Sequence, residues 1–246
     1  MLSARLRRWL ITAAALAAAA LTAKLGLWQL DRAHQKLAMQ AAIEERARLP
    51  AIDQVATLAA DASMAVLQHH RLLILAGRWS AAHTVYLDNR QMSGRVGFFV
   101  VTPLVLDDGT ALLVQRGWMP RDFQQRSRIA EVPTVAGRIV AQGRIAPPPT
   151  RLFEFGADEG GRIRQNLDVD VFARETGLRL RPMSLLLAES EAGTGDGLQR
   201  DWPAPSAGIA KNRAYAAQWF ALSALILVLY VWFQLIQPRR GGHARN

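Results

Sequence analysis

This chain of 246 residues contains no cysteine, which excludes disulfides and thiolate metal sites. Six of the basic groups behind its formal net charge of +10 lie in the terminal tails, so residues 24–213 carry 24 basic groups against all 20 acidic ones. That near balance, without a basic stripe interleaved with aromatics, excludes nucleic acid as a partner.

Two apolar segments lie near the ends of the chain, Trp9 to Leu30 and Ala216 to Ile236. They are 22 and 21 residues long, and at about 1.5 Å per helical residue they extend about 32 Å, enough to cross a hydrocarbon core of about 30 Å. No other segment is as long and as uncharged. We therefore expect a transmembrane helix at each end, with the lipid bilayer as a partner.

The basic residues that flank these segments predict their orientation. Arginines 5, 7 and 8 precede the first segment and arginines 239, 240 and 245 follow the second, and neither tail contains an acidic residue. Because basic residues beside a span are retained on the cytoplasmic side, we expect residues 1–8 and 237–246 to be cytoplasmic tails and residues 31–215 to lie outside. Trp28, Tyr215 and Trp219 would then lie at the outer headgroup level.

A cleavable signal peptide is the alternative interpretation of the N-terminus, because a basic start leads into an Ala-rich core with small residues at 18–20. Against it, apolar character resumes after Lys24 in residues 25–28, which a cleaved leader does not need. The long side chain of Lys24 can reach the membrane boundary from within a retained span.

Beyond the first span, residues 31–48 are rich in Ala, Gln, Glu and Arg and contain no helix breaker before Pro50. This composition predicts that the first helix continues out of the membrane. Residues 53–66 favour a short helix capped by Asp53.

The middle of the chain has the composition of strands, rich in Val, Leu, Ile and aromatics and punctuated by Gly, Asn and Asp. The predicted strands are 71–79, 84–87, 97–106, 111–116, 137–145 and 183–188, with a hairpin turn at 107–109 in which Gly109 supplies a positive φ. A short helix at 168–176 starts with an Asp cap and ends at a glycine, and the Gly- and Pro-rich residues 191–208 predict a pliable connection to the second span. The expected fold class is an α+β membrane protein, in which two transmembrane helices flank an antiparallel β-rich extracytoplasmic domain.

Three separated motifs suggest a family. They are LGLWQLDRAHQK at 25–36, DNRQMSGRVGFFVVTPLVLDDGTALLVQRGWMPRD at 88–122 and YAAQWFALS at 215–223. Together they resemble the Surfeit locus protein 1 family, which includes the Shy-type proteins of mitochondria and bacteria. The resemblance covers nearly the whole chain. It implies a protein of the bacterial inner membrane with a periplasmic domain, which assists assembly of haem-copper cytochrome c oxidase, contacts oxidase subunits and handles haem a as a chaperone.

The first motif contributes candidate site residues around the outer end of the first span. Gly26 would let another helix approach closely, and Trp28 suits either interfacial anchoring or ligand contact. Arg32 and Lys36 lie four residues apart on one helical face, where they could meet lipid phosphates or haem propionates. His34 lies between them and is a candidate iron ligand, as are His69 and His70 farther along the chain.

The third motif contributes Tyr215, Gln218 and Trp219, which could line a haem pocket or serve as interfacial anchors. The resemblance predicts a histidine three residues before Tyr215, but this chain has Asn212 there. Asparagine is a poor axial ligand for haem iron, whereas tyrosine ligates iron in some haem proteins. Haem a is therefore the expected cofactor by resemblance alone.

In the central motif, most matching residues are Gly or Pro with architectural roles. Arg90 and Arg116 are the better functional candidates because arginine can bind carboxylates bidentately, although salt bridges to Asp88 or Asp122 would explain both.

No motif of a hydrolase, metalloprotease or phosphate-binding enzyme occurs, and no enzymatic activity is expected. The first hypothesis is an oxidase assembly factor that handles haem a, and the second is a cofactor-free scaffold that docks oxidase subunits. A third, enzymatic hypothesis would require isolated Ser, His and Asp residues of the outer domain to converge in space.

Overall fold

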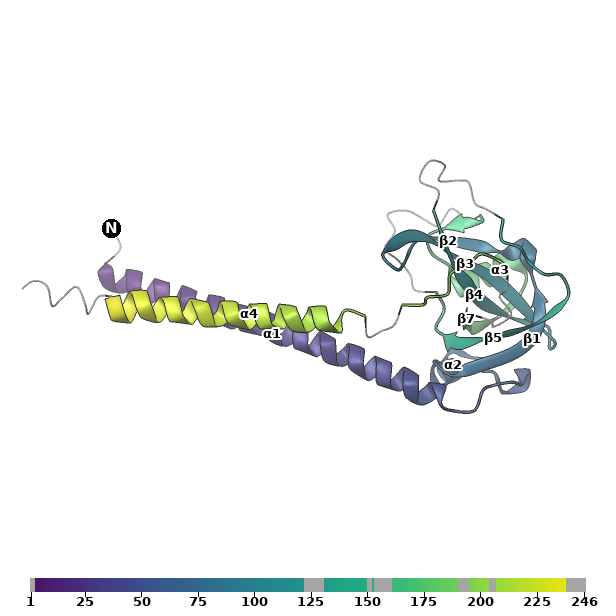
Figure 1. The fold of residues 1–246 in the computed structure, drawn as a ribbon, viewed down its shortest axis with the longest axis horizontal. Helices are drawn as coiled ribbons and strands as arrows, with labels where there is room; N and C mark the ends of the chain where they lie inside the picture. The colour runs from purple at the N-terminus through teal and green to yellow at the C-terminus, as the bar shows by residue number, and fades with distance from the viewer. Residues whose placement is uncertain are drawn as a thin grey trace, which may run out of the picture. The chain divides into compact units, whose positions relative to one another are not determined.

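A computed structural model describes residues 3–121, 131–149, 152, 161–189, 195–203 and 207–237 (Figure 1). The chain divides into two compact units. The helical unit consists of residues 1–41 and 204–246, and the sheet unit consists of residues 42–203.

The helical unit is built from α1 (Ala4–Ala47), whose residues 42–47 belong to the sheet unit, and from α4 (Ile209–Val231). The π-helical segment η3 (Trp232–Ile236) continues α4. Both helices are long and apolar enough to cross a membrane. The uninterrupted course of α1 to Ala47 confirms that the first helix continues beyond its apolar part, as its Ala-rich composition predicted.

The two helices pack against each other along a regular seam (Figure 1). On both helices, a series of buried and half-buried positions recurs at alternating spacings of three and four residues, the pattern of coiled-coil packing. On α1 these positions are Ala15, Ala19, Thr22, Gly26, Gln29, Ala33 and Lys36, and on α4 they are Ile209, Asn212, Ala216, Trp219, Ser223, Ile226 and Tyr230. Small residues dominate the α1 side, which allows the helix backbones to approach closely.

The sheet unit contains a seven-stranded sheet in the order β1-β5-β7-β4-β3-β2-β6. Its strands are β1 (Leu72–Trp79), β2 (Val85–Met92), β3 (Arg95–Leu106), β4 (Thr110–Pro120), β5 (Arg138–Ala146), β6 (Ile163–Arg164) and β7 (Arg179–Leu187). Because β1 pairs with both β5 and β3, the strands β1, β5, β7, β4 and β3 form a closed ring. A closed ring satisfies strand edges that an open sheet leaves free.

The expectation of an antiparallel sheet was wrong in part, because β7 pairs parallel to β4 and β6 pairs parallel to β2. The chain between β4 and β7 contains β5, β6 and helix α3 (Val169–Thr176), which together provide the long connection that a parallel pair requires. The sheet is therefore mixed.

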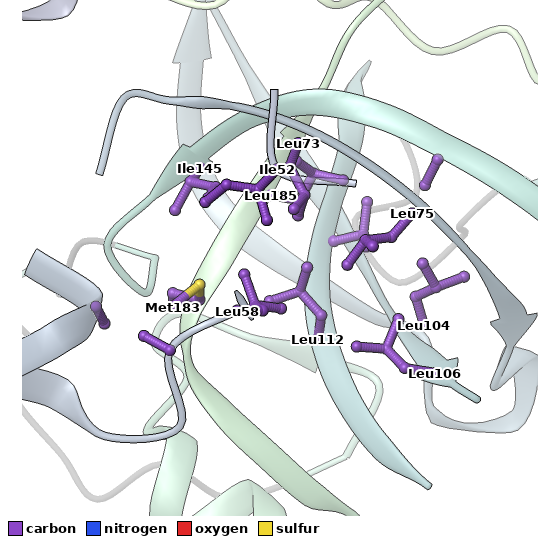
Figure 2. Packing of buried hydrophobic residues seen from close by; sticks show 14 of the residues in the cluster. Ile52, Leu58, Leu73, Leu75, Leu104, Leu106, Leu112, Ile145, Met183 and Leu185 are labelled. Atoms are coloured by element: carbon purple, nitrogen blue, oxygen red, sulfur yellow. The ribbon is translucent and has the colours of Figure 1, made fainter. Parts of the chain in front are cut away.

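The main core lies within the ring (Figure 2). Leucines 73, 75, 104 and 112 join Ile145, Met183 and Leu185 there, with Ile52 and Leu58 added from the segment before β1. On β4, Leu112 faces this core while Leu113 joins a second cluster with Val101 and with Phe172 of α3. Alternate residues of one strand thus bury opposite faces of the sheet.

Local capping explains which predicted helices form. The predicted helix at 168–176 is confirmed as α3, because the Asp168 side chain accepts from the amides of Asp170 and Val171 and Gly177 ends the helix at φ +71. The helix predicted at 53–66 was largely wrong: a 3-10 turn covers Val55–Thr57, and the helix α2 covers Ala62–Gln68 with Asp61 as its cap. Leu58 and Ala59 lie buried in the core between the two.

The predicted hairpin turn at 107–109 is confirmed between β3 and β4, where Gly109 has φ +73.

Candidate functional site

The predicted cofactor residues surround one end of the α1–α4 seam, where three polar side chains meet. Asn212 donates from Nδ2 to Oε1 of Gln29 at 2.7 Å. Lys36 donates from Nζ to Oδ1 of Asn212 at 2.9 Å and to the carbonyl of Ala207 at 3.1 Å. We call Gln29, Lys36 and Asn212 the polar node. It links the two helices across their seam.

Close helix contact beside the node depends on a glycine. A Cβ atom at Gly26 would lie 2.7 Å from the Phe220 ring, well inside van der Waals contact. The prediction that Gly26 permits close approach of another helix is confirmed, and that helix is α4.

Farther along the seam, two more hydrogen bonds join the helices. Ser223 Oγ donates to the carbonyl of Ala19 at 2.9 Å, and the hydroxyls of Thr12 and Tyr230 lie 2.8 Å apart. Polar contacts at several levels fix how the helices align lengthwise, since each is lost if one helix slides.

The aromatic candidates lie at the surface of the helix pair, each beside a cation of its own helix. Trp28 is 51% exposed with the Arg32 guanidinium 5.8 Å from its ring centroid, and Tyr215 is 41% exposed with Lys211 Nζ at 5.8 Å. These distances fit cation–π contact. Each helix thus carries one ring–cation pair at its surface.

The remaining predicted site residues are divided between surface and seam. His34 and Gln218 are exposed on α1 and α4, whereas Trp219 is half-buried at a seam position. Lys36, which was grouped with Arg32 as a contact for phosphates or propionates, instead binds within the polar node.

Asn212 does not fit the role of a haem ligand. Its amide donates to Gln29 and accepts from Lys36, so both ends of the side chain already serve the helix pair. An amide is in any case a weak axial ligand compared with imidazole or thiolate. Asn212 therefore joins the two helices and is not assigned as an iron ligand.

Arg116 forms a buried ion pair, but not with the predicted partners. It lies 3.3 Å from Asp196, which Arg200 also contacts at 2.6 Å, and the three side chains are 4%, 2% and 4% exposed. Its guanidinium also lies over the Trp79 ring. Burial lowers the pKa of Arg116, and the charge of Asp196 opposes that shift.

Arg90 contacts the backbone of a distant segment. Its Nη2 donates to the carbonyl of Gln165 at 2.7 Å, its own carbonyl accepts from Trp118 Nε1 at 2.9 Å, and burial lowers its pKa. Asp88 pairs with Arg121 instead, and Asp122 lies outside the described residues. These contacts of Arg90 and Arg116 with backbone, Asp196 and Trp79 are architectural.

Residues 195–203, which we call the strap, pack against the sheet in a way that composition did not predict. Gln199 and Trp118 exchange backbone hydrogen bonds at 2.7 and 2.8 Å, and Trp202 donates from Nε1 to the carbonyl of Leu187 at 2.9 Å. With Asp196 buried as well, the predicted pliable connection is wrong for the strap.

His69 and His70 lie half-buried beside Arg46 and Arg144. Burial lowers the pKa of both rings, and the charge of Arg46 lowers both further, as does that of Arg144 for His70. Both imidazoles are therefore held toward the neutral form. Within the described ranges, no group of three or more His, Asp or Glu side chains could hold a metal ion.

Neither the Gln29–Asn212 hydrogen bond nor the Asp196–Arg116 ion pair was predicted from the sequence. For the polar node, the available signal was that Gln29, Lys36 and Asn212 occupy heptad positions that small or apolar residues otherwise fill. The burial of Asp196 was not predicted because this residue lies in a Gly-rich stretch, which indicated a pliable connection.

The chain combines two apolar helices, joined by hydrogen bonds at several points of their seam, with a closed mixed sheet that lies between them in sequence. This combination defines the class of the protein as a two-helix protein suited to a membrane. The profile of the SURF1 family matches residues 16–224, so the chain belongs to the SURF1 family. The matched range takes in most of α1, the sheet unit and the part of α4 that carries the node. The family resemblance found in the three motifs is confirmed.

Individual relatives agree with this assignment. A SURF1-like protein of Rickettsia bellii is 26% identical over 227 residues, which cover 90% of each chain. A SURF1-like protein of Rickettsia felis is 25% identical over 85% of this chain and 90% of the relative. The cytochrome oxidase assembly protein SHY1 of Saccharomyces cerevisiae is 29% identical over 99 residues, 40% of this chain and 25% of the yeast protein.

Proposed function

We propose that this protein assists assembly of haem-copper cytochrome c oxidase in the bacterial inner membrane, where it docks oxidase subunits without turning over a substrate. The observation that carries the proposal is the family match over residues 16–224, which includes parts of both apolar helices as well as the sheet unit. The name of the yeast relative supplies the oxidase connection.

The proposed topology follows the distribution of arginines. Both tails lie in the cytoplasm, residues 9–30 and 216–236 span the membrane, and residues 31–215 lie on the periplasmic side. Placement in the membrane is supported by the length and apolar surface of α1 and α4. Leucines and aromatic residues of both helices are exposed, as are valines of α4, as lipid contact requires.

The helix pair supports docking through a fixed alignment. The polar node, the Gly26–Phe220 contact and the two hydrogen bonds farther along the seam each join α1 to α4 at a different level. A partner in the membrane would therefore meet one defined surface rather than two independent helices.

Deletion of the gene tests the assembly role. We expect cells that lack the protein to contain less assembled oxidase and less haem a in their membranes, and expression of the wild-type chain to restore both. Unchanged oxidase activity and unchanged reduced-minus-oxidised haem a bands in the deletion strain, under conditions that require the oxidase, would refute the proposal.

Transient handling of haem a is the second candidate. Two observations favour it: the exposed rings of Trp28 and Tyr215, which could contact a porphyrin face, and the exposed side chain of His34 on the same helix as Arg32. Haem a would bring the redox and ligand-binding chemistry of its iron, and these residues would hold it.

Visible absorption of the full-length protein, purified in detergent from cells that synthesise haem a, separates the two candidates. Docking without a cofactor predicts no Soret band for the wild-type chain. A band that the His34→Ala variant loses would establish haem handling, with Gln35→Ala as the control on the neighbouring exposed position. Asn212→His tests whether histidine at that position creates a ligand.

A further inference from the structure

Basic residues outnumber acidic ones at the end of the helix pair that holds the polar node. Segments 24–36 and 207–219 contain five basic residues, and Asp31 is the one acidic residue in them. Asp31 accepts a hydrogen bond from Gln35 at 2.8 Å, and Lys36 is bound within the node. Arg32, Lys211 and Arg213 are exposed, and we call these three the cationic collar.

On each helix, one cation of the collar lies four residues from an aromatic ring, on the same side of that ring. On α1, Arg32 follows Trp28 by four residues, and on α4, Lys211 precedes Tyr215 by four. Because α1 and α4 run in opposite directions, both cations lie on the side of the ring that faces away from the apolar span. Four helical residues correspond to about 6 Å along the axis.

This order matches the layers of a phospholipid interface. Aromatic rings are favoured at the level where acyl chains meet headgroups, and the cations beyond them would reach the phosphates. Arg32 and Lys211 also lie within 6 Å of their rings, which restricts where these two charges are held. An acidic protein surface would not require the same ring-then-cation order on two separate helices.

We propose that the cationic collar binds the phosphate headgroups of anionic phospholipids, with Trp28 and Tyr215 packed beside the upper acyl chains. The inference rests on the membrane placement given in the proposed function and adds a lipid-binding site to it. Phosphatidylglycerol is a suitable probe because it carries a net negative charge, whereas phosphatidylcholine has the same phosphate with a compensating cation.

The test compares spin-labelled phosphatidylglycerol and spin-labelled phosphatidylcholine in vesicles that contain the full-length protein. The wild-type chain is expected to bind the anionic lipid more tightly, and added salt should reduce this preference. A variant with Arg32→Gln, Lys211→Gln and Arg213→Gln should bind both lipids equally, with a loss of up to about fivefold for each cation removed.

A matched control removes an exposed charge elsewhere: Arg138→Gln, on β5, should leave the lipid preference unchanged. If the triple variant fails to insert, Lys211→Gln alone should lower the preference by up to about fivefold. No preference in the wild-type chain, or a preference that the substitutions do not alter, would overturn the proposal. So would a triple variant with normal lipid preference that fails to restore oxidase, since the cations would then serve a protein partner. Unaffected oxidase in the deletion strain would refute the assembly role and leave the lipid result standing.

Discussion

Asp196 is a buried charged residue of the sheet unit with two cationic partners. It lies between Arg116 and Arg200, with all three side chains almost fully buried. Removing one partner of a buried ion pair leaves an uncompensated charge in the interior, which costs about 3–5 kcal/mol. The segment around Asp196 therefore depends on this residue to remain against the sheet.

We expect Asp196→Ala to lower the free energy of unfolding by about 3–5 kcal/mol, because Arg116 and Arg200 would remain buried without a carboxylate. Denaturant titration of the full-length protein in detergent, followed by tryptophan fluorescence, measures the change. Asp107→Ala is the control, since the Arg138–Asp107 pair is more than half exposed and its loss should cost less than about 1 kcal/mol. Equal effects of the two substitutions would contradict the role given to Asp196.

Asn212 is the residue on which the polar node depends, because it contacts both Gln29 and Lys36. We expect Asn212→Ala to destabilise the helix pair by about 1 kcal/mol, since interhelical hydrogen bonds in membrane proteins average about 0.6 kcal/mol each. The midpoint of the loss of helical ellipticity in sodium dodecyl sulfate measures this. Gln218→Ala, on the exposed face of the same helix, should leave the midpoint unchanged.

At the scale of elements, the α1–α4 seam depends on steric fit as well as on polar contacts. Gly26→Leu would place a side chain where the Phe220 ring lies, and we expect it to separate the helices locally. Because the chain has no cysteine, a disulfide between Ala19→Cys and Ser223→Cys reports seam contact cleanly. The Gly26→Leu substitution should reduce the cross-linking yield, and Phe220→Ala in the same protein should restore it. An unaffected yield would show that Gly26 is not a contact point.

The junction between α2 and β1 gives the sheet unit a predicted pH dependence. Since the pKa of His69 and His70 is lowered in the folded state, stability is fully present above the unfolded value of about 6.5 and is lost as pH falls through the lowered folded value. We expect His70→Asn to weaken this loss, because asparagine tolerates the local φ of +74 and does not titrate. Thermal unfolding between about pH 7 and pH 5 measures the difference, and identical pH profiles for variant and wild type would contradict it.

At the scale of the whole molecule, local signals predicted the elements better than their pairing. The apolar lengths of 9–30 and 216–236, the caps of α3 and the turn at Gly109 are properties of neighbouring residues, and the corresponding elements form as predicted. The β1–β3 closure and the parallel β4–β7 pair join strands far apart in sequence, and no local pattern encodes which strands meet.

In the candidate site too, features set by neighbouring residues were predicted and contacts between distant residues were not. The exposure of Trp28 and Tyr215 beside basic residues follows from their places at the ends of apolar spans. The Gln29–Asn212 hydrogen bond could not be predicted, because it depends on how α1 and α4 align lengthwise. Likewise, the partner of Arg116 lies 80 residues away in a segment whose composition suggested a loose connection.

The proposed topology anchors the protein in the membrane at both ends and places the sheet unit on the periplasmic side. Labelling of single cysteines by a membrane-impermeant maleimide in intact spheroplasts tests this most directly, since the natural chain has no cysteine. Ala62→Cys in the sheet unit should react at once, whereas Ser3→Cys should react only after the membrane is permeabilised. Reaction of both positions in intact spheroplasts, or of neither, would contradict the account.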